Sequence, residues 1–214
     1  MNRFISVILT VLLLATTVNA QELKPIKLNV PDKERGSSIM KALSDRHSER
    51  EFSTKKLSLQ DLSDLLWAAN GINRPDGRRT AATARNNQDI DVYAIMEEGA
   101  YIYDAKAHEL KPVVEGDHRS LIADAQASVK DAPVSLLIVS DLSRFAGAEL
   151  ERQKQWGAFD AGIVSQNIML FASGCGFVTV PRAFMKKEEL KKVLKLSETQ
   201  EPMLNNPVGY PKKK

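Results

Sequence analysis

The pattern of apolar and polar residues predicts its clearest helix over residues 58–70. Ser58 and Asp61 resemble a capping box at its start, and Gly71 is placed to end it. Between them, apolar residues recur at the three- and four-residue spacing of one helix face. This stripe comprises Leu59, Leu62, Leu65, Leu66 and Ala69. Weaker patterns of the same kind predict helices over 37–45, 117–129, 158–173 and 188–196.

Short runs rich in β-branched and aromatic residues predict strands in the middle of the chain. Residues 91–97, 101–103 and 110–114 follow one another with turns between them, which predicts an antiparallel meander. The nearly continuous apolar run 135–139 is typical of a buried central strand. Residues 177–180 predict a short later strand. Because helices precede, separate and follow these strands, we predict an α+β fold.

The N-terminus has the pattern of an export signal. Arg3 precedes an apolar run over 5–15, and Val18-Asn19-Ala20 supplies small residues suited to cleavage. The run is short for a membrane span. We therefore predict a signal peptide over 1–20 and a periplasmic or secreted protein with no stable membrane anchor after cleavage. The alternative is an uncleaved N-terminal anchor.

The rest of the chain is predicted to form an N-terminal arm and one domain. Residues 21–36 are polar and contain two prolines, so we expect an extended arm, and 37–214 form the domain. Within it, the helix predicted over 158–173 carries many small residues, which let another backbone approach closely. A dimer interface and tight core packing explain these residues equally well.

Charge and cysteine content exclude some classes of function. The net charge of +3 is modest and the basic residues are spread along the chain, which argues against a nucleic-acid surface. Cys175 is the only cysteine, so it forms no intrachain disulfide; we expect a buried thiol, with a covalent dimer as the alternative. His47, His108 and His118 have no further ligand at metal-site spacing, so we predict no metal site.

A compact anion-binding cluster directly follows the helix predicted over 37–45. It reads Arg46-His47-Ser48-Glu49-Arg50. The planar fork of arginine suits phosphate bidentately, and serine and histidine add directional hydrogen bonds. From the residues alone, the cluster is either a phosphate site for a nucleotide-like cofactor or a solvated, charged helix end.

Several segments, taken in order, resemble the FMN-dependent nitroreductases. Arg46, Ser48 and Arg50 resemble the Arg-x-Ser-x-Arg/Lys motif that follows the first helix of that family. The later similar segments are 65–74, 78–88, 156–162, 176–181 and 207–211. The resemblance extends from about Ser37 to the C-terminus.

This resemblance implies an α+β fold with a central, mainly antiparallel sheet flanked by helices. It also implies an intertwined homodimer that binds FMN at the subunit interface with residues of both chains. Arg46, Ser48 and Arg50 would lie at the FMN phosphate and ring edge, with His47 nearby. The other residues that the resemblance assigns to FMN are Thr83 and Asn86 in a polar loop, Val180, Pro181 and Arg182 near flavin N5, and Lys213 among the three C-terminal lysines at the phosphate.

Three features depart from the family pattern. Ala82-Thr83 stands where many relatives have Pro-Ser, which keeps a hydroxyl group but loses the φ constraint of proline. Arg182 is large and charged where many relatives have small residues, so we expect it to reshape the substrate side of the flavin. The chain ends three residues after Pro211, which leaves the C-terminal phosphate contact open.

The function implied by the resemblance is that of an exported FMN-dependent oxidoreductase. It would transfer two electrons through flavin N5 to or from a small, aromatic or quinone-like substrate. Because the flavin supplies the redox chemistry, no side chain is predicted to be catalytic. If the protein is exported, its electron donor is not determined, and NAD(P)H, a quinol and a protein are the three candidates. Tyr93, Tyr101 and Tyr103 either stack on such a substrate or belong to the core.

Two other functions remain as alternatives at this point. One is an FMN-binding carrier or sensor without turnover, which Arg182 and Ala82-Thr83 would favour if they cover the flavin. The other is a cofactor-free α+β domain that binds an acidic ligand at Arg46 and Arg50.

Overall fold

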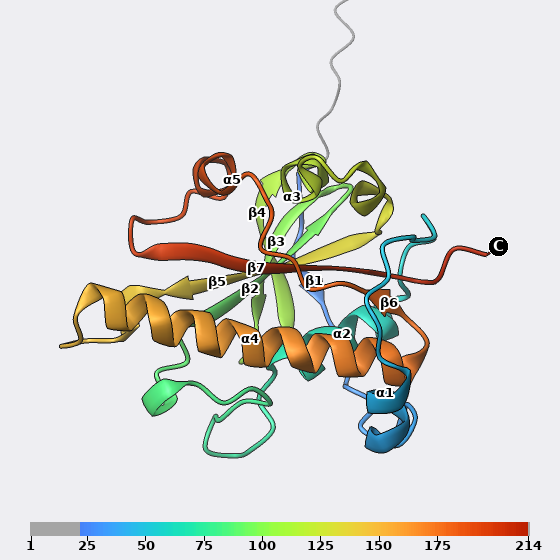
Figure 1. Cartoon of the computed structure of the whole chain (residues 1–214), viewed down its shortest axis with the longest axis horizontal. Helices are drawn as coiled ribbons and strands as arrows, with labels where there is room; N and C mark the ends of the chain where they lie inside the picture. The colour runs from blue at the N-terminus through green and yellow to red at the C-terminus, as the bar shows by residue number, and fades with distance from the viewer. Residues whose placement is uncertain (1–21, 214) are drawn as a thin grey trace, which may run out of the picture.

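The centre of the protein is a seven-stranded sheet, seen in a computed structural model that describes residues 22–213. The strand order is β1-β4-β3-β2-β5-β7-β6, and every neighbouring pair is antiparallel (Figure 1). The strands are β1 (Ile26–Lys27), β2 (Ile90–Met96), β3 (Gly99–Asp104), β4 (Glu109–Glu115), β5 (Val134–Asp141), β6 (Val178–Thr179) and β7 (Gln200–Gly209). The predicted α+β class and antiparallel sheet are confirmed.

Helices cover both faces of this sheet. They are α1 (Ile39–Asp45), α2 (Leu59–Asn70), α3 (Arg119–Ala123), α4 (Leu150–Cys175) and α5 (Lys187–Val193), with single 3-10 turns η1 (Ala84–Asn86), η2 (Ala127–Asp131) and η3 (Leu142–Arg144). Successive side chains of β2 point to opposite faces of the sheet, as the pleat of a strand requires, and belong to two different hydrophobic cores. Val92 and Ala94 join the core beneath α2 and α4, whereas Tyr93 and Ile95 join the core beneath α3 and α5.

Local signals predicted several of these elements correctly. The Ser58 hydroxyl accepts the Asp61 backbone N–H at 3.1 Å and donates to the Asp61 carboxylate at 2.7 Å, so the predicted cap of α2 is confirmed. Four residues of its apolar stripe are buried, and Leu59 is the exposed exception at 43%. The meander β2-β3-β4 and the buried strand β5 are also confirmed.

One prediction about secondary structure was wrong, and one strand was not predicted. The helix predicted over 117–129 is split into α3 and η2, because Asp124 between them adopts a left-handed φ of 50°. Strand β7 was not predicted, since Pro202 and Pro207 cannot donate to a ladder and two asparagines stand between them. It pairs with β5 from Gln200 to Val208, whereas among residues 22–213 its other edge meets only β6 and a single bridge to Arg182.

The segment predicted as an arm is attached to the domain at several points. β1 pairs with β4, and the Arg35 guanidinium bonds Asp61 at 2.9 Å and Asp64 at 2.7 Å. The signal peptide predicted over 1–20 lies outside the described residues. Within residues 22–213, no helix combines the length and apolar character needed to cross a membrane.

Helix α4 lies very close to the sheet, across its lower face in Figure 1. At Gly157 a Cβ atom would come within 2.4 Å of the Ser140 hydroxyl on β5 and 2.9 Å of its Cβ. The Ser165 hydroxyl donates to the Asn206 side chain on β7 at 2.8 Å. Glycine at 157 therefore sets how closely this helix approaches the strands.

We expect the Gly157→Ala substitution to lower the free energy of unfolding by about 1–3 kcal/mol, because the added methyl group overpacks the α4–β5 contact. The measurement is urea unfolding followed by circular dichroism. Gly174→Ala is the matched control on the same helix, since a Cβ there makes only ordinary contacts, the nearest with Ala42 Cβ at 3.5 Å. If the two variants were equally stable, the close-approach argument would be wrong.

Candidate functional site

The Arg46–Arg50 cluster begins where α1 ends. The backbone N–H of Arg46 closes the helix on the Ala42 carbonyl at 3.0 Å, and the residues that follow turn toward solvent. Within residues 22–213, the guanidinium groups of Arg46 and Arg50 make no hydrogen bond or ion pair. Ser48 is exposed, and the His47 ring nitrogen Nδ1 lies 2.8 Å from the Asp45 carbonyl. Two unpaired guanidiniums beside a free hydroxyl fit the donor set that a phosphate requires.

The fold brings two other predicted segments to this cluster. The Glu49 N–H donates to the Thr179 carbonyl at 3.0 Å, which places the cluster beside β6 and the turn after it. A bridge between Phe52 and Pro211 aligns it with the C-terminal segment. Arg50 lies two residues before Phe52, and Lys213 lies two residues after Pro211. Because the two segments run antiparallel, both residues lie on the same side of the bridge. A hollow of about 230 Å³ between these segments is lined by Asp45, His47, Glu49, Met169, Ala172, Ser173, Gly176, Phe177, Val178, Thr179 and Pro211.

Arg182 has a different role from the one predicted. Its side chain is buried, and its guanidinium donates to carbonyl groups at the end of α3 and to two amide side chains. These contacts are Ile122 at 2.8 Å, Ala123 at 3.0 Å, Gln126 at 2.9 Å and Asn205 at 2.9 Å. Burial lowers the pKa of Arg182, and the nearby charge of Arg50 acts in the same direction. The side chain therefore does not reshape a flavin face.

In the turn over 180–182, the side chains are not available to a ligand, so only backbone groups can contact one. The Val180 side chain is buried against Phe52 and Ala132, and Pro181 has no N–H group. The backbone N–H of Arg182 donates to the Asn205 carbonyl at 2.9 Å. Arg182 thus acts by fixing this turn against α3 and β7.

Thr83 and Asn86 lie in a strained loop beside the first half of α4. The Thr83 hydroxyl accepts the Gln88 N–H at 2.9 Å, and the Asn86 side chain is exposed. Arg85, Asn86 and Gln88 have φ angles of 55°, 56° and 49°. Left-handed backbone at non-glycine residues costs free energy and often marks a functional site.

The predicted cofactor residues form two groups, at different ends of α4 (Figure 1). The loop with Thr83 and Asn86 is tied to α4 where the Ala84 N–H donates to Asp160 at 2.8 Å. The α1 end is tied where the Ser173 hydroxyl donates to the Ala42 carbonyl at 2.8 Å. Thirteen residues separate these ties, a helical rise of roughly 20 Å. One chain therefore does not gather all the predicted residues around a single ligand.

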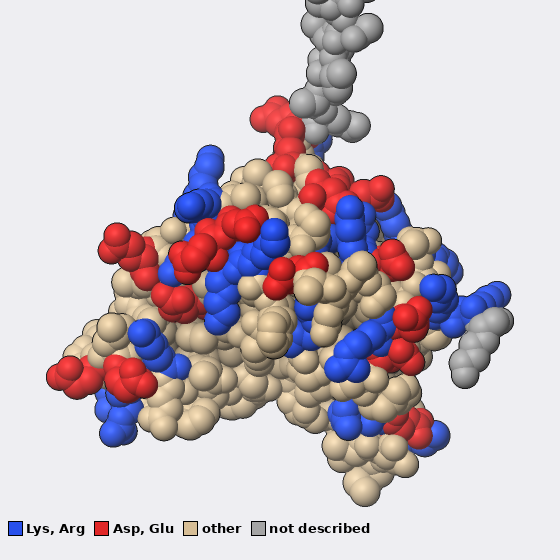
Figure 2. Space-filling model, turned by 45° about the horizontal axis from the view of Figure 1, so that its top comes forward, with Lys and Arg blue, Asp and Glu red and all other residues tan. Residues whose placement is uncertain are grey.

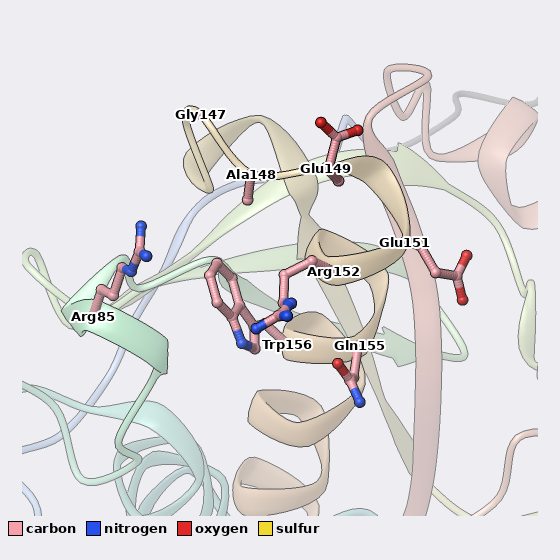
Figure 3. A pocket seen from close by; sticks show the side chains of 8 residues that line it. All are labelled: Arg85, Gly147, Ala148, Glu149, Glu151, Arg152, Gln155 and Trp156. Atoms are coloured by element: carbon pink, nitrogen blue, oxygen red, sulfur yellow. The ribbon is translucent and has the colours of Figure 1, made fainter.

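Sequence reasoning missed a cavity at the start of α4 (Figure 3). Its volume is about 650 Å³. Arg85 of the strained loop and Arg152 of α4 flank the Trp156 ring there, with guanidinium carbons 4.9 and 5.7 Å from the ring centroid. The available signal was the four-residue spacing of Arg152 and Trp156, which places both on one helix face.

The tyrosines belong to the core rather than to a pocket. Tyr93, Tyr101 and Tyr103 are all less than 7% exposed and divide between the two faces of the sheet. Cys175 is half-buried, and burial raises the pKa of its thiol. Within residues 22–213, no group of three or more His, Cys, Asp or Glu side chains is placed to hold a metal ion.

Comparison with known proteins identifies the family. The sequence pattern of the nitroreductase family matches residues 43–210. The chain belongs to the nitroreductase family. Members of this family are oxidoreductases that generally depend on a flavin, so the predicted class of enzyme is supported at this level.

Three similar proteins show how far the likeness to other nitroreductases extends. A provisionally named nitroreductase of Methanocaldococcus jannaschii is 28% identical over 193 residues, which cover 86% of this chain and 96% of that protein. The crystal structure of a provisionally named nitroreductase from Ralstonia eutropha JMP134 is 30% identical, with a TM-score of 0.80 over 89% of this chain and 90% of that one. Nitroreductase A from Vibrio parahaemolyticus, at 19% identity over 82% of this chain and 69% of its own, shares the fold with a TM-score of 0.63.

The predicted periplasmic or secreted location is corrected by these findings. It depended on residues 1–20 alone, which lie outside the described residues. The nitroreductase match begins at residue 43, and the M. jannaschii protein is matched over 96% of its length. The predicted location is therefore withdrawn, and with it the argument from export that leaves the electron donor open.

Two buried carboxyl groups lie beneath the strained loop. Asp89 and Asp160 are each at most 3% exposed, and the Ser140 hydroxyl donates to Asp89 at 2.6 Å. Burial, together with the hydrogen bond and charge of Asp160, raises the pKa of Asp89 to about 7. Asp89 thus keeps a proton that it would lose in the unfolded chain, where its pKa is 3.8.

We expect stability to fall as the pH rises from about 4 to about 7, because in this window the folded state retains the Asp89 proton and the unfolded state does not. Above about pH 7, Asp89 is ionised in both the folded and the unfolded state, so its contribution to stability no longer changes with pH. Asp89→Asn, which removes the titration, should flatten this part of the profile. The measurement is urea unfolding at several pH values; an identical slope in the two proteins would contradict the assignment.

Proposed function

We propose that this protein is an FMN-dependent oxidoreductase that works as a homodimer and shares each FMN between its two subunits. The observation that carries the proposal is the division of the predicted cofactor residues between the two ends of α4. A single chain leaves each group incomplete. A two-fold symmetric partner would set the loop group of one chain beside the Arg46–Arg50 group of the other.

Exposed apolar side chains support such a dimer. They lie on α1 and on the outer face of α4, and they comprise Ile39, Met40, Leu43, Phe159 and Ile163, each at least 40% exposed. Among the described residues, none has an atom within 4 Å of the Cβ position at Gly162 beside them, which leaves room for a second backbone. In Figure 2 the middle of the lower edge carries few charges, whereas charges of both signs lie at its two ends and above it. Large exposed apolar side chains on two neighbouring helices are typical of an interaction site.

The residues of each group suit different parts of FMN. Arg46, Ser48 and Arg50 would hold the phosphate, with His47 from the lining of the adjacent hollow and Lys213 from the C-terminal segment. Thr83 and Asn86 would come from the partner's copy of the loop to the polar edge of the ring. The backbone of the Val180–Arg182 turn would approach N5. When bound, FMN supplies two-electron transfer to or from a small aromatic or quinone-like substrate.

The alternative of a carrier or sensor without turnover has lost one of its two supports. It required Arg182 to cover the flavin face, and that side chain is turned inward against α3. We therefore favour the enzyme.

The test of the cofactor site is the visible absorption spectrum of the purified protein titrated with FMN. Bound flavin should appear with perturbed bands, and Arg46→Ala should weaken binding by about tenfold to a hundredfold, because a charge-assisted contact is lost. Arg78→Ala is the matched control, since Arg78 is exposed and its only ion pair among residues 22–213 is with Asp76. Flavin bound equally by both variants would contradict the assignment of Arg46.

The same preparation separates the enzyme from the carrier. NADH, NADPH, a quinol and a reduced carrier protein are supplied in turn as reductants, followed by a nitroaromatic or a quinone as oxidant. Rapid reduction and reoxidation through many cycles is the expected result. Flavin that stays bound but is not turned over by any pair would favour the carrier.

We expect the wild-type protein to sediment as a dimer and Phe159→Glu to shift it toward monomer, because the charge would be buried at the α4 interface without a partner. The measurement is analytical ultracentrifugation over a range of concentrations. Val30→Glu, at a position that is 85% exposed on the N-terminal arm, is the control. A monomeric wild-type protein would rule out the shared site.

A further inference from the structure

The cavity at the start of α4 contains two cations without a counter-ion. Arg85 and Arg152 form no ion pair and donate no side-chain hydrogen bond within residues 22–213. Glu149 and Glu151 also line this cavity, but in Figure 3 their carboxylates point away from Trp156. The positive charge is therefore not neutralised by the residues around it.

Within residues 22–213 the two guanidiniums contact the Trp156 ring, and neither is supported by an ion pair. Arg152 lies in the first turn of α4, where a positive charge opposes the helix dipole. Arg85 is held in left-handed backbone, with φ 55° and ψ 17°. Both side chains are exposed. An arrangement that costs stability and leaves charge unpaired is typical of a binding site.

Trp156 gives the cavity a rigid aromatic surface. Its indole packs against Phe145, which is 1% exposed, with ring centroids 5.6 Å apart. The two guanidiniums approach this ring from two sides (Figure 3). A flat aromatic ligand with an anionic group fits this cavity. The indole provides apolar contact for the ring, and the arginines provide bidentate donors for the anion.

We propose that this cavity binds a planar aromatic acid, with its ring in contact with Trp156 and its carboxylate between Arg85 and Arg152. The inference rests on the proposed function, because Arg85 directly precedes Asn86, the residue expected at the flavin. The cavity then selects anionic aromatic compounds as substrates of the redox reaction. Its volume of about 650 Å³ lies within the range of small-molecule sites.

The binding test compares 4-nitrobenzoate with 4-nitrobenzamide, which has nearly the same shape and no charge. Both quench tryptophan emission, and Trp67→Phe leaves Trp156 as the only tryptophan. The benzoate should bind at least about tenfold more tightly than the benzamide. Arg85→Gln and Arg152→Gln should each reduce this preference.

A kinetic test uses the FMN-loaded protein. Each arginine variant should raise KM for 4-nitrobenzoate with little change in kcat, and should leave the benzamide unaffected. Arg78→Ala is again the control, because it lies in the same polar region and does not line the cavity. Equal affinity for the two compounds, or an acid preference that survives both arginine substitutions, would overturn the proposal.

The outcomes also separate this inference from the proposed function. A protein that binds FMN and turns it over without preferring the acid retains its function and loses the selective cavity. A protein that ignores FMN but still binds 4-nitrobenzoate through Arg85 and Arg152 retains the cavity and loses the redox role.

Discussion

The close contact of α4 with the sheet is the constraint on which the rest of the structure depends. Gly157 lets the helix approach β5, and the Ser165–Asn206 hydrogen bond fixes it on β7. The same helix positions the strained loop through Asp160 and the end of α1 through Ser173. A change in the height or rotation of α4 would therefore move both groups of candidate cofactor residues, although they lie roughly 20 Å apart along the helix.

The parts of the fold that depend on local signals could be predicted from the sequence. Ser58 caps α2 as expected, and the run within β5 is buried because helices cover both of its faces. Strand β7 could not be predicted, because its extended conformation comes from pairing with β5, which is distant in the sequence. Its prolines are tolerated since β7 has no continuous partner strand on its other edge within residues 22–213. The break at Asp124 is likewise invisible to periodicity.

The sequence named the candidate site residues but not their separation or their partners. The motif at Arg46, Ser48 and Arg50 faces solvent beside β6 and the C-terminal segment, as a phosphate site requires. Arg182 was misjudged because a sequence does not show which carbonyl groups converge on a side chain. The four acceptors of its guanidinium come from residues 122–126 and from β7, which meet only in the folded chain.

The arginines of residues 22–213 fall into two groups, according to whether their guanidinium groups bind other residues of the protein. Most bind carboxylates, carbonyl groups or amides, as Arg35, Arg144 and Arg182 do. The guanidiniums that form no hydrogen bond or ion pair in this part of the chain are those of Arg46, Arg50, Arg85 and Arg152. Because guanidinium forks bind anions so well, charges left unpaired at just two places indicate external anions. The first place suits the phosphate of a cofactor, and the second suits the carboxylate of a substrate.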